Sequence, residues 1–262
     1  MLLAAGLALA IAMVALRLRA LAPSGAIVAV LMGTIVVAAG GWWSGIVLVV
    51  FFGSSSLVSQ INRQSTILQA RGSQRDGVQV LANGWGMMAG TILYSLTDWR
   101  PWLLFGMGAI AAATADTWSS EIGRTSAAPP RLVTTWKRVP RGSSGAVSAR
   151  GLLASVAGGT LIAVLAAIGL WQSSSEFSTN VPLIIALVAL AGFLGALVDS
   201  YLGAVVQEQR FCDVCNGRTE ANPHTCGNPT RHVGGMRGFN NDVVNFLCVL
   251  TGALIGLFSG IL

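Results

Sequence analysis

The chain consists of long runs of apolar residues separated by polar stretches. Most runs approach the roughly 20 residues that an α-helix needs to cross a bilayer. They predict eight membrane-spanning helices, at residues 1–16, 24–40, 43–60, 78–96, 102–123, 147–171, 181–207 and 241–262. Only the tetrapeptide GGWW lies between the second and third runs. These two runs therefore form either a hairpin or one long bent helix, and the latter would leave seven helices.

Composition supports a membrane protein. Of the 262 residues, 53% are hydrophobic and only 10% are charged, whereas soluble domains carry about a quarter charged residues. The mean hydropathy is +0.69. We therefore expect an all-α, polytopic transmembrane bundle. It should form a single membrane domain over residues 1–262, with a cytoplasmic loop containing Cys and His at 209–240.

The basic residues are unevenly distributed along the chain. Of the 16 Lys and Arg residues, 15 lie on alternate connections between the predicted helices, and only Arg100 does not. This positive-inside pattern places those connections in the cytoplasm and both termini outside. We expect a multi-pass protein of a prokaryotic plasma membrane. The net charge of +6 then suits an anionic substrate or lipid. No aromatic residues interleave with the charges, so nucleic acid is not an expected partner.

Polar residues gather where the predicted helices meet the cytoplasmic side. Ionisable groups inside a span usually face the bundle interior and mark function. Asn240 and Asn241 are equally good candidates for helix N-caps, but capping does not explain Asp199, which is mid-helix. The set comprises Asn83, Asp116, Glu121, Asp199, Asn240, Asn241, Asp242 and Asn245.

Oxygen ligands from three helices suit Mg²⁺, which is often held by one or two carboxylates together with substrate phosphates. Asp116 and Glu121 are five residues apart, about 140° around an ideal helix. Both therefore reach one site only if the helix ends or distorts near Ser120.

The connection at 131–151 predicts an anion site. Its cations are followed by a Gly/Ser stretch immediately before the next helix, and free N–H groups at a helix start attract phosphates. The alternative is an ordinary basic loop with a Ser cap. The candidate residues here are Thr135, Lys137, Arg138, Arg141, Ser143 and Ser144.

The loop at 209–240 contains a possible structural zinc site. Cys212 and Cys215 form a C-x-x-C pair, and Cys226 follows with either His224 or His232 as a fourth ligand. Reduced thiols or a redox-formed loop closure are the alternatives. A cytoplasmic location argues against a stable disulfide.

Several long motifs resemble the integral-membrane phytyl-phosphate kinase family. They are QVLANG (79–84), ATADTWSSEIG (113–123), PRLVTTWKRVPRGSSGAVSARG (130–151), GALVDSYLGAVVQ (195–207) and NNDVVNF (240–246), with CDVC and HTCG before the last. The family includes the plant vitamin E pathway enzyme and the vertebrate transmembrane protein nineteen. It is similar, more distantly, to the membrane dolichol kinases that use CTP.

The resemblance implies transfer of the terminal phosphate of a nucleoside triphosphate, CTP, to an isoprenyl or phytyl monophosphate, with Mg²⁺. It implies catalytic roles for Asp116, Glu121, Lys137, Arg138 and Asp199. The oxygen ligands on three helices predict Mg²⁺ ligation by Asp116, Asp199 and Asp242. Nucleotide or phosphate binding would also involve Asn83, Asn240, Asn241 and Asn245. A membrane cytidylyltransferase acting on a lipid phosphate and an ion-coupled transporter are the alternatives.

Overall fold

A computed structural model of the protein describes residues 1–62, 74–173, 181–220 and 222–262. Its helices are α1 (Leu2–Arg17), α2 (Pro23–Asn62), α3 (Gly77–Thr97), α4 (Pro101–Arg124), α5 (Ala149–Ser173), α6 (Val181–Val205) and α7 (Asn241–Ser259). They follow the predicted apolar runs to within three residues at each end. The hydrophobic pattern therefore located the helical segments correctly.

Helix α2 folds back on itself at Gly41, whose φ of 78° and ψ of 175° lie outside the helical region. Ala29 and Phe52 line the same hollow, although a straight helix would hold them roughly 35 Å apart at 1.5 Å per residue. Val37 and Gly45 lie against each other across the turn. The second and third predicted helices are therefore a hairpin, and glycine supplies the positive φ that the turn requires.

Local sequence signals explain where several helices begin. Asp76 and Gln79 form a capping box at α3, in which Asp76 Oδ1 accepts from the Gln79 N–H at 2.9 Å. Pro101 occupies the first turn of α4, where its missing N–H is not needed. Asn240 caps α7 by accepting from the N–H groups of Asp242 and Val243.

Helix α4 is the centre of the bundle. It packs against α2, α3, α5, α6 and α7, and every residue from Leu104 to Ala115 is buried. Small residues permit this packing, since a side chain at Gly108 would overlap Gly252 of α7. The close approach of α4, α6 and α7 positions the polar residues at their ends.

Among the described residues, four helices are long and apolar enough to cross a membrane: α2, α5, α6 and α7. Helix α1 is apolar but shorter. The prediction of a polytopic helical membrane protein agrees with this finding, while the number of crossings, seven or eight, stays a prediction. Arg63 and Arg71, which contribute to the charge pattern, lie outside the described residues.

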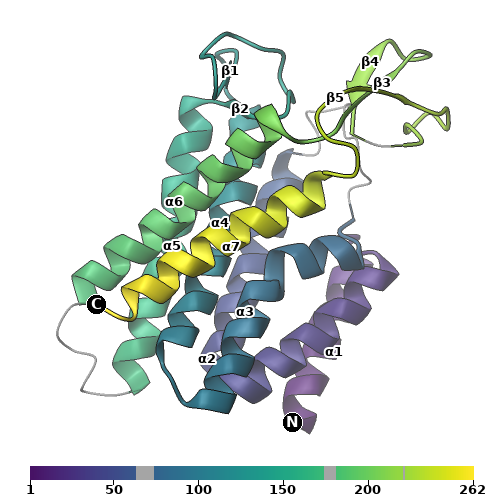
Figure 1. Ribbon diagram of the computed structural model, residues 1–262. Helices are drawn as coiled ribbons and strands as arrows, with labels where there is room; N and C mark the ends of the chain where they lie inside the picture. Colours follow the sequence, from purple (N-terminus) through teal and green to yellow (C-terminus); the bar gives the residue numbers. More distant parts are fainter. Residues whose placement is uncertain (63–73, 174–180, 221) are drawn as a thin grey trace.

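Two small antiparallel sheets make the fold less purely helical than predicted. Strands β1 (Arg131–Leu132) and β2 (Ala146–Val147) pair with each other, while β3 (Gln209–Cys212) lies between β4 (Gly217–Thr219) and β5 (Arg231–Gly234). Such short strands give no readable alternation of polar and apolar residues. Figure 1 shows both sheets at one end of the bundle, with the termini toward the other end.

Candidate functional site

An open hollow of about 790 Å³ lies at the end of the bundle that carries the sheets. Its walls come from the end of α4, the Gly/Ser loop (Arg141–Ser148), the later part of α6, the start of α7 and the loop at 209–240. Its polar lining residues are Ser119, Ser120, Arg124, Arg141, Ser143, Ser144, Ser148, Asp199, Ser200, Gln207, Glu220 and Asn241. Segments far apart in sequence therefore form one polar surface.

Two aspartates from different helices meet at this hollow. Asp199 of α6 lines it, and the side chain of Asp199 is hydrogen-bonded to that of Asp116 on α4. Within the described residues, Asp199 Oδ2 is buried without a hydrogen-bond partner. Two carboxylates this close repel each other unless a proton or a cation lies between them. The pair is therefore suited to hold a cation.

Glu121 points elsewhere. Its Oε1 accepts from Ser59 Oγ of α2 at 3.2 Å and lies 4.0 Å from Arg124 Nη1. It also interacts with Arg75, whose pKa is lowered to about 10 by burial, an effect that Glu121 opposes. Because α4 remains helical to Arg124, the five-residue spacing keeps the Glu121 side chain apart from the Asp116–Asp199 contact.

Asn83 also lies outside the polar hollow. It lines a second, mostly apolar hollow of about 440 Å³ between the α2 hairpin and α3, with Arg75 and Gln79 as its other polar residues. The Asn83 amide donates to Gln79 O at 2.9 Å. Arg75 on this hollow and Arg124 on the polar one both interact electrostatically with Glu121.

The Gly/Ser loop is pressed against the end of α6. Gly142 and Gly145 have φ values of +82° and +74°, and a side chain at Gly145 would overlap Ala204. Ser144 Oγ donates to Gln207 Oε1 at 2.6 Å. Ser148 Oγ accepts from the Gly151 N–H at 3.1 Å at the start of α5. Ser148 therefore caps α5, as the alternative of a Ser cap anticipated. The loop brings the hydroxyl groups of Ser143, Ser144 and Ser148 to the hollow.

The structure divides the predicted cations into two groups. Arg141 lines the hollow while its Nη2 donates to the carbonyl oxygens of Ser126 and Ala127, at 2.7 and 2.9 Å. Thr135, Lys137 and Arg138 are exposed, on the turn that follows β1, and none of them is part of the lining. Among the described residues, the second cation on the lining is Arg124.

The residues of the predicted asparagine motif at the start of α7 also have different surroundings. Asn240 uses its side-chain oxygen to cap the helix, as the capping interpretation anticipated. Asn241 lines the hollow. Asp242 is buried, at 8% exposure, and Asn245 is half-buried one turn below Asn241. Cys248, a further turn along, lies near both Asp116 and Asp199. One face of α7 therefore approaches the acid pair.

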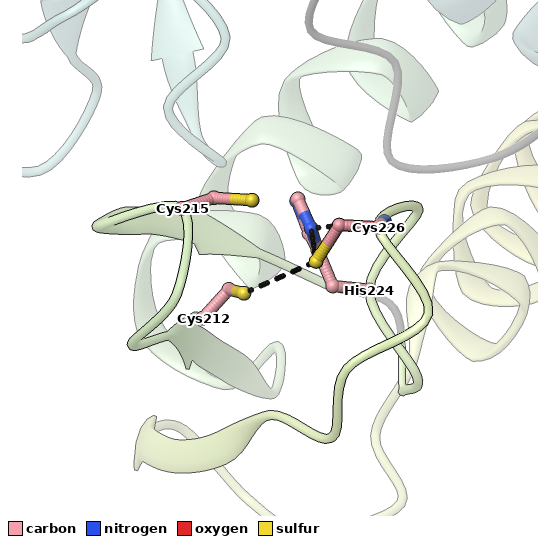
Figure 2. Close-up of side chains that lie close together, drawn as sticks. All are labelled: Cys212, Cys215, His224 and Cys226. Atoms are coloured by element: carbon pink, nitrogen blue, oxygen red, sulfur yellow. Dashed lines mark hydrogen bonds between the residues drawn. The ribbon is translucent and has the colours of Figure 1, made fainter.

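The structure brings the predicted Cys/His cluster together within the loop at 209–240 (Figure 2). The side chains of Cys212, Cys215, His224 and Cys226 place their ligand atoms within 4.8 Å of one another. Hydrogen bonds from the Asn228 side chain and backbone, then from His224, lower the pKa of Cys226 to about 5. The pKa of Cys215 is raised to about 11, chiefly by a hydrogen bond between Cys215 and Cys226. His232 bonds to Gly235 O instead, at 3.1 Å.

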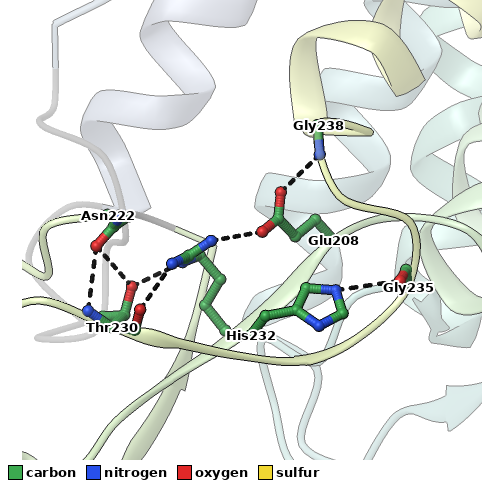
Figure 3. Close-up of polar contacts among 7 residues, drawn as sticks. Glu208, Asn222, Thr230, His232, Gly235 and Gly238 are labelled. Carbon is green, nitrogen blue, oxygen red and sulfur yellow. Dashed lines mark hydrogen bonds and ion pairs between the residues drawn. The ribbon is translucent and has the colours of Figure 1, made fainter.

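Polar contacts join distant parts of the segment between α6 and α7 (Figure 3). Glu208, a short distance after the end of α6, accepts from the Gly238 N–H at 2.8 Å and pairs with Arg210. These contacts hold the pKa of Glu208 below its usual value. Arg210 also donates to Thr230, whose hydroxyl and N–H donate to Asn222 Oδ1. The network ties the start of the loop to its return strand.

Several lining residues were not selected from the sequence. Ser119, Ser120 and Arg124 follow Asp116 on α4, and Ser200 and Gln207 follow Asp199. A signal was present for most of them, because Ser119, Ser120, Ser200 and Gln207 lie inside the quoted motifs. Glu220 had no such signal, since it reaches the hollow only through the fold of the loop at 209–240.

Comparisons with known proteins agree with the motif resemblance. The family described as integral membrane protein DUF92 matches residues 6–253. Protein PGR of Arabidopsis thaliana is 38% identical over 196 residues, 68% of this chain and 67% of PGR. The chloroplastic protein VTE6 of the same plant is 28% identical over 157 residues, 59% of this chain and 38% of VTE6. An uncharacterized Synechocystis membrane protein is 31% identical over 163 residues, 59% of each chain. No solved structure matches the chain.

Proposed function

The chain belongs to the integral membrane family DUF92, and on that premise we propose that it is a membrane kinase of isoprenoid metabolism. It transfers the terminal phosphate of a nucleoside triphosphate, CTP, to an isoprenyl or phytyl monophosphate. An oxygen of the lipid phosphate forms a bond to the terminal phosphorus, the bond to the nucleotide's second phosphate breaks, and CDP and the lipid diphosphate result. The relationship to VTE6, the vitamin E pathway member of the family, supports this choice.

One observation carries the proposal. Two carboxyl groups, Asp116 and Asp199, touch each other beside a hollow whose opposite wall is a Gly/Ser loop at a helix start. A metal-binding pair facing an anion-binding loop is the arrangement that nucleotide phosphates require. Phosphoryl transfer depends mainly on positioning and on charge neutralisation, so these groups provide its main needs.

The acid pair fits Mg²⁺. Asp116 and Asp199 would hold the ion, because Asp199 Oδ2 is buried without a partner among the described residues and two adjacent carboxylates need a cation or a shared proton. Asn241 offers a further oxygen on the same hollow, and Asp242 lies on the same first turn of α7. Bound there, Mg²⁺ supplies neutralisation of the charge that develops on the transferred phosphate.

The protein's own groups bind and orient the nucleotide. Ser143, Ser144 and Ser148 line the hollow, and their hydroxyls would turn from their present partners, Pro140 O, Gln207 Oε1 and Gly123 O, to the phosphates. Arg124 and Arg141 bring positive charge to the same hollow. The lipid phosphate is already an anion, so no side chain has to remove a proton from it before transfer. The difficulty is repulsion between two anions, which the arginines reduce.

The second hollow suits the acceptor lipid. It is lined by Phe51, Phe52 and other apolar residues of the α2 hairpin and α3, with Arg75 at its polar side. A prenyl tail lies among such side chains without exposing apolar surface. Arg75 on this hollow and Arg124 on the polar one offer positive charge to the lipid phosphate on each side.

The alternatives differ in what they produce. A cytidylyltransferase needs the same metal and phosphate groups but releases pyrophosphate and leaves CMP on the lipid. Ion-coupled transporters usually bind near the middle of the membrane, whereas the polar hollow here lies where α4 ends and α7 begins. The location of the hollow therefore favours a reaction at the membrane surface.

Two labelled nucleotides test the proposal. Purified protein in lipid is given phytyl monophosphate, Mg²⁺ and CTP labelled on either the α- or the γ-phosphate. A kinase moves only the γ-label into the lipid product, whereas a cytidylyltransferase moves only the α-label. Failure to move either label, over a panel of prenyl monophosphates and with ATP as a second donor, would overturn the proposal.

A further inference from the structure

The loop between α6 and α7 brings four metal-ligating side chains together from two turns. Cys212 ends β3, and Cys215 lies in the turn that leads to β4. His224 and Cys226 lie in a second turn, which is closed by bonds from His224 N to Asn228 O and from Gly227 N to His224 O. All four ligand atoms lie within 4.8 Å of one another (Figure 2).

We propose that Cys212, Cys215, His224 and Cys226 bind one structural Zn²⁺ ion. The distances fit such a site: Cys212 Sγ lies 3.7 Å from Cys226 Sγ, and His224 Nδ1 lies 3.1 Å from Cys226 Sγ. A tetrahedral zinc with Zn–S bonds of about 2.3 Å separates its sulfur ligands by roughly 3.8 Å. Four protein ligands close the coordination shell, as in structural zinc sites.

The surroundings support the same assignment. Asn228 Nδ2 lies 3.4 Å from Cys226 Sγ, and N–H donors to sulfur are typical second contacts that orient metal ligands. His232 bonds to Gly235 O, away from the cluster. Cys248 is buried in α7 against Ala112. The structure therefore selects His224 over His232 and leaves Cys248 out.

The small sheet needs such an ion. Its strands β3, β4 and β5 have only 4, 3 and 4 residues, too few to bury a hydrophobic core. Units this small usually depend on metals or disulfides for their stability. The ion joins the turn after β3 to the turn at 222–228, so it crosslinks the two halves of the loop.

This crosslink also fixes part of the candidate active site. Gln207 lies two residues before the zinc-bound loop, Glu220 lies within it, and both line the polar hollow. Gln207 accepts from Ser144 of the Gly/Ser loop at 2.6 Å. The zinc ion therefore holds one wall of the hollow in place without touching the substrates, and it does so whichever reaction takes place there.

Metal analysis tests the proposal. The protein is prepared without chelator and without a histidine tag, and its zinc is measured by mass spectrometry. We expect about one zinc per chain, because the site has one set of four ligands. Cobalt exchanged into the site should show thiolate-to-metal absorption and the visible bands of tetrahedral Co²⁺. Native protein with no bound zinc, or with the thiols of Cys212, Cys215 and Cys226 all freely titratable, would overturn the proposal.

Matched variants locate the ion. His224→Ala and Cys215→Ser should reduce bound zinc to about a tenth or less of the native amount, because a ligand is lost in each. His232→Ala and Cys248→Ser, a neighbouring histidine and a thiol outside the cluster, should keep it. Loss of zinc in the control variants, or its retention in the ligand variants, would contradict the assignment. Zinc content is measured without substrates, so it is independent of the proposed kinase activity.

Discussion

The acidic residues of α4 have different surroundings although they belong to one motif. Asp116 contacts Asp199, while Glu121 contacts Ser59 and Arg124. In a regular helix the sequence predicts different directions for these two side chains, because a spacing of five residues corresponds to about 140° of rotation. The sequence did not show whether α4 would distort near Ser120. The structure shows that α4 is helical to Arg124, so the two side chains keep different directions.

At the residue scale, Asp116→Asn should lower the rate of phosphate transfer by about a hundredfold, or about 2.7 kcal/mol of barrier. The change keeps the shape of the side chain but removes charge that Mg²⁺ requires. The rate is measured at limiting Mg²⁺. Asp98→Asn, at the C-terminal end of α3, is the matched control and should retain the native rate. Near-native transfer by both Asp116→Asn and Asp199→Asn would mean that these acids are structural.

The cations give a second prediction at this scale. Arg124 lines the hollow, whereas Lys137 is exposed on the turn after β1. Arg124→Gln should therefore raise the KM for CTP by about tenfold, a loss of about 1.4 kcal/mol of binding. Lys137→Gln should change it by less than about twofold. The reverse order of effects would show that Lys137 binds the nucleotide, as the sequence alone predicted.

At the scale of elements, the Gly/Ser loop offers a matched pair of glycines. Both Gly142 and Gly145 have positive φ, but only Gly145 is pressed against α6, at Ala204. Alanine at either position costs about 1 kcal/mol or more of backbone strain, and at Gly145 it must also push the loop away from the hollow. Gly145→Ala should therefore raise the KM for CTP well above the value for Gly142→Ala, in steady-state assays. Equal effects would show that the contact with α6 does not position the loop.

The helices and strands also show which parts of the fold could be predicted from sequence patterns. Apolar runs located each helical segment, because bilayer-length runs are unambiguous. The hairpin at Gly41 was left open because GGWW is compatible with both a turn and a bend. The place of Lys137 and Arg138 was missed because it depends on the pairing of β1 with β2, and strands of two residues leave no pattern in the sequence.

At the scale of the whole molecule, the C-terminus and the polar hollow lie toward opposite ends of the bundle (Figure 1). The charge pattern predicts that the hollow faces the cytoplasm, where nucleotides are available. Alkaline phosphatase fused after Leu262 should therefore be active in bacterial cells, and a green fluorescent protein fused there should be dark. The reverse result would place the hollow outside and exclude CTP as its ligand.

The gathering of the site at one end of the bundle was predictable at this scale. Acids and amides in separate segments, such as Asp116, Asp199 and Asn241, all approached the side that the basic loops mark. Which of them meet was not predictable, since that depends on how α4, α6 and α7 rotate against each other. The second hollow beside Arg75 also has no signal in the sequence, because it forms only where the α2 hairpin folds back onto α3.

The most direct test of the central claim is to locate the metal. A crystal structure with Mn²⁺ and a non-hydrolysable CTP analogue, with anomalous scattering recorded for manganese, would show its position. The account predicts a manganese peak at coordination distance, about 2 Å, from the carboxylates of Asp116 and Asp199, with the phosphates against the Gly/Ser loop. A nucleotide-bound structure with manganese elsewhere, and with these two carboxyl groups still bonded to each other, would contradict it.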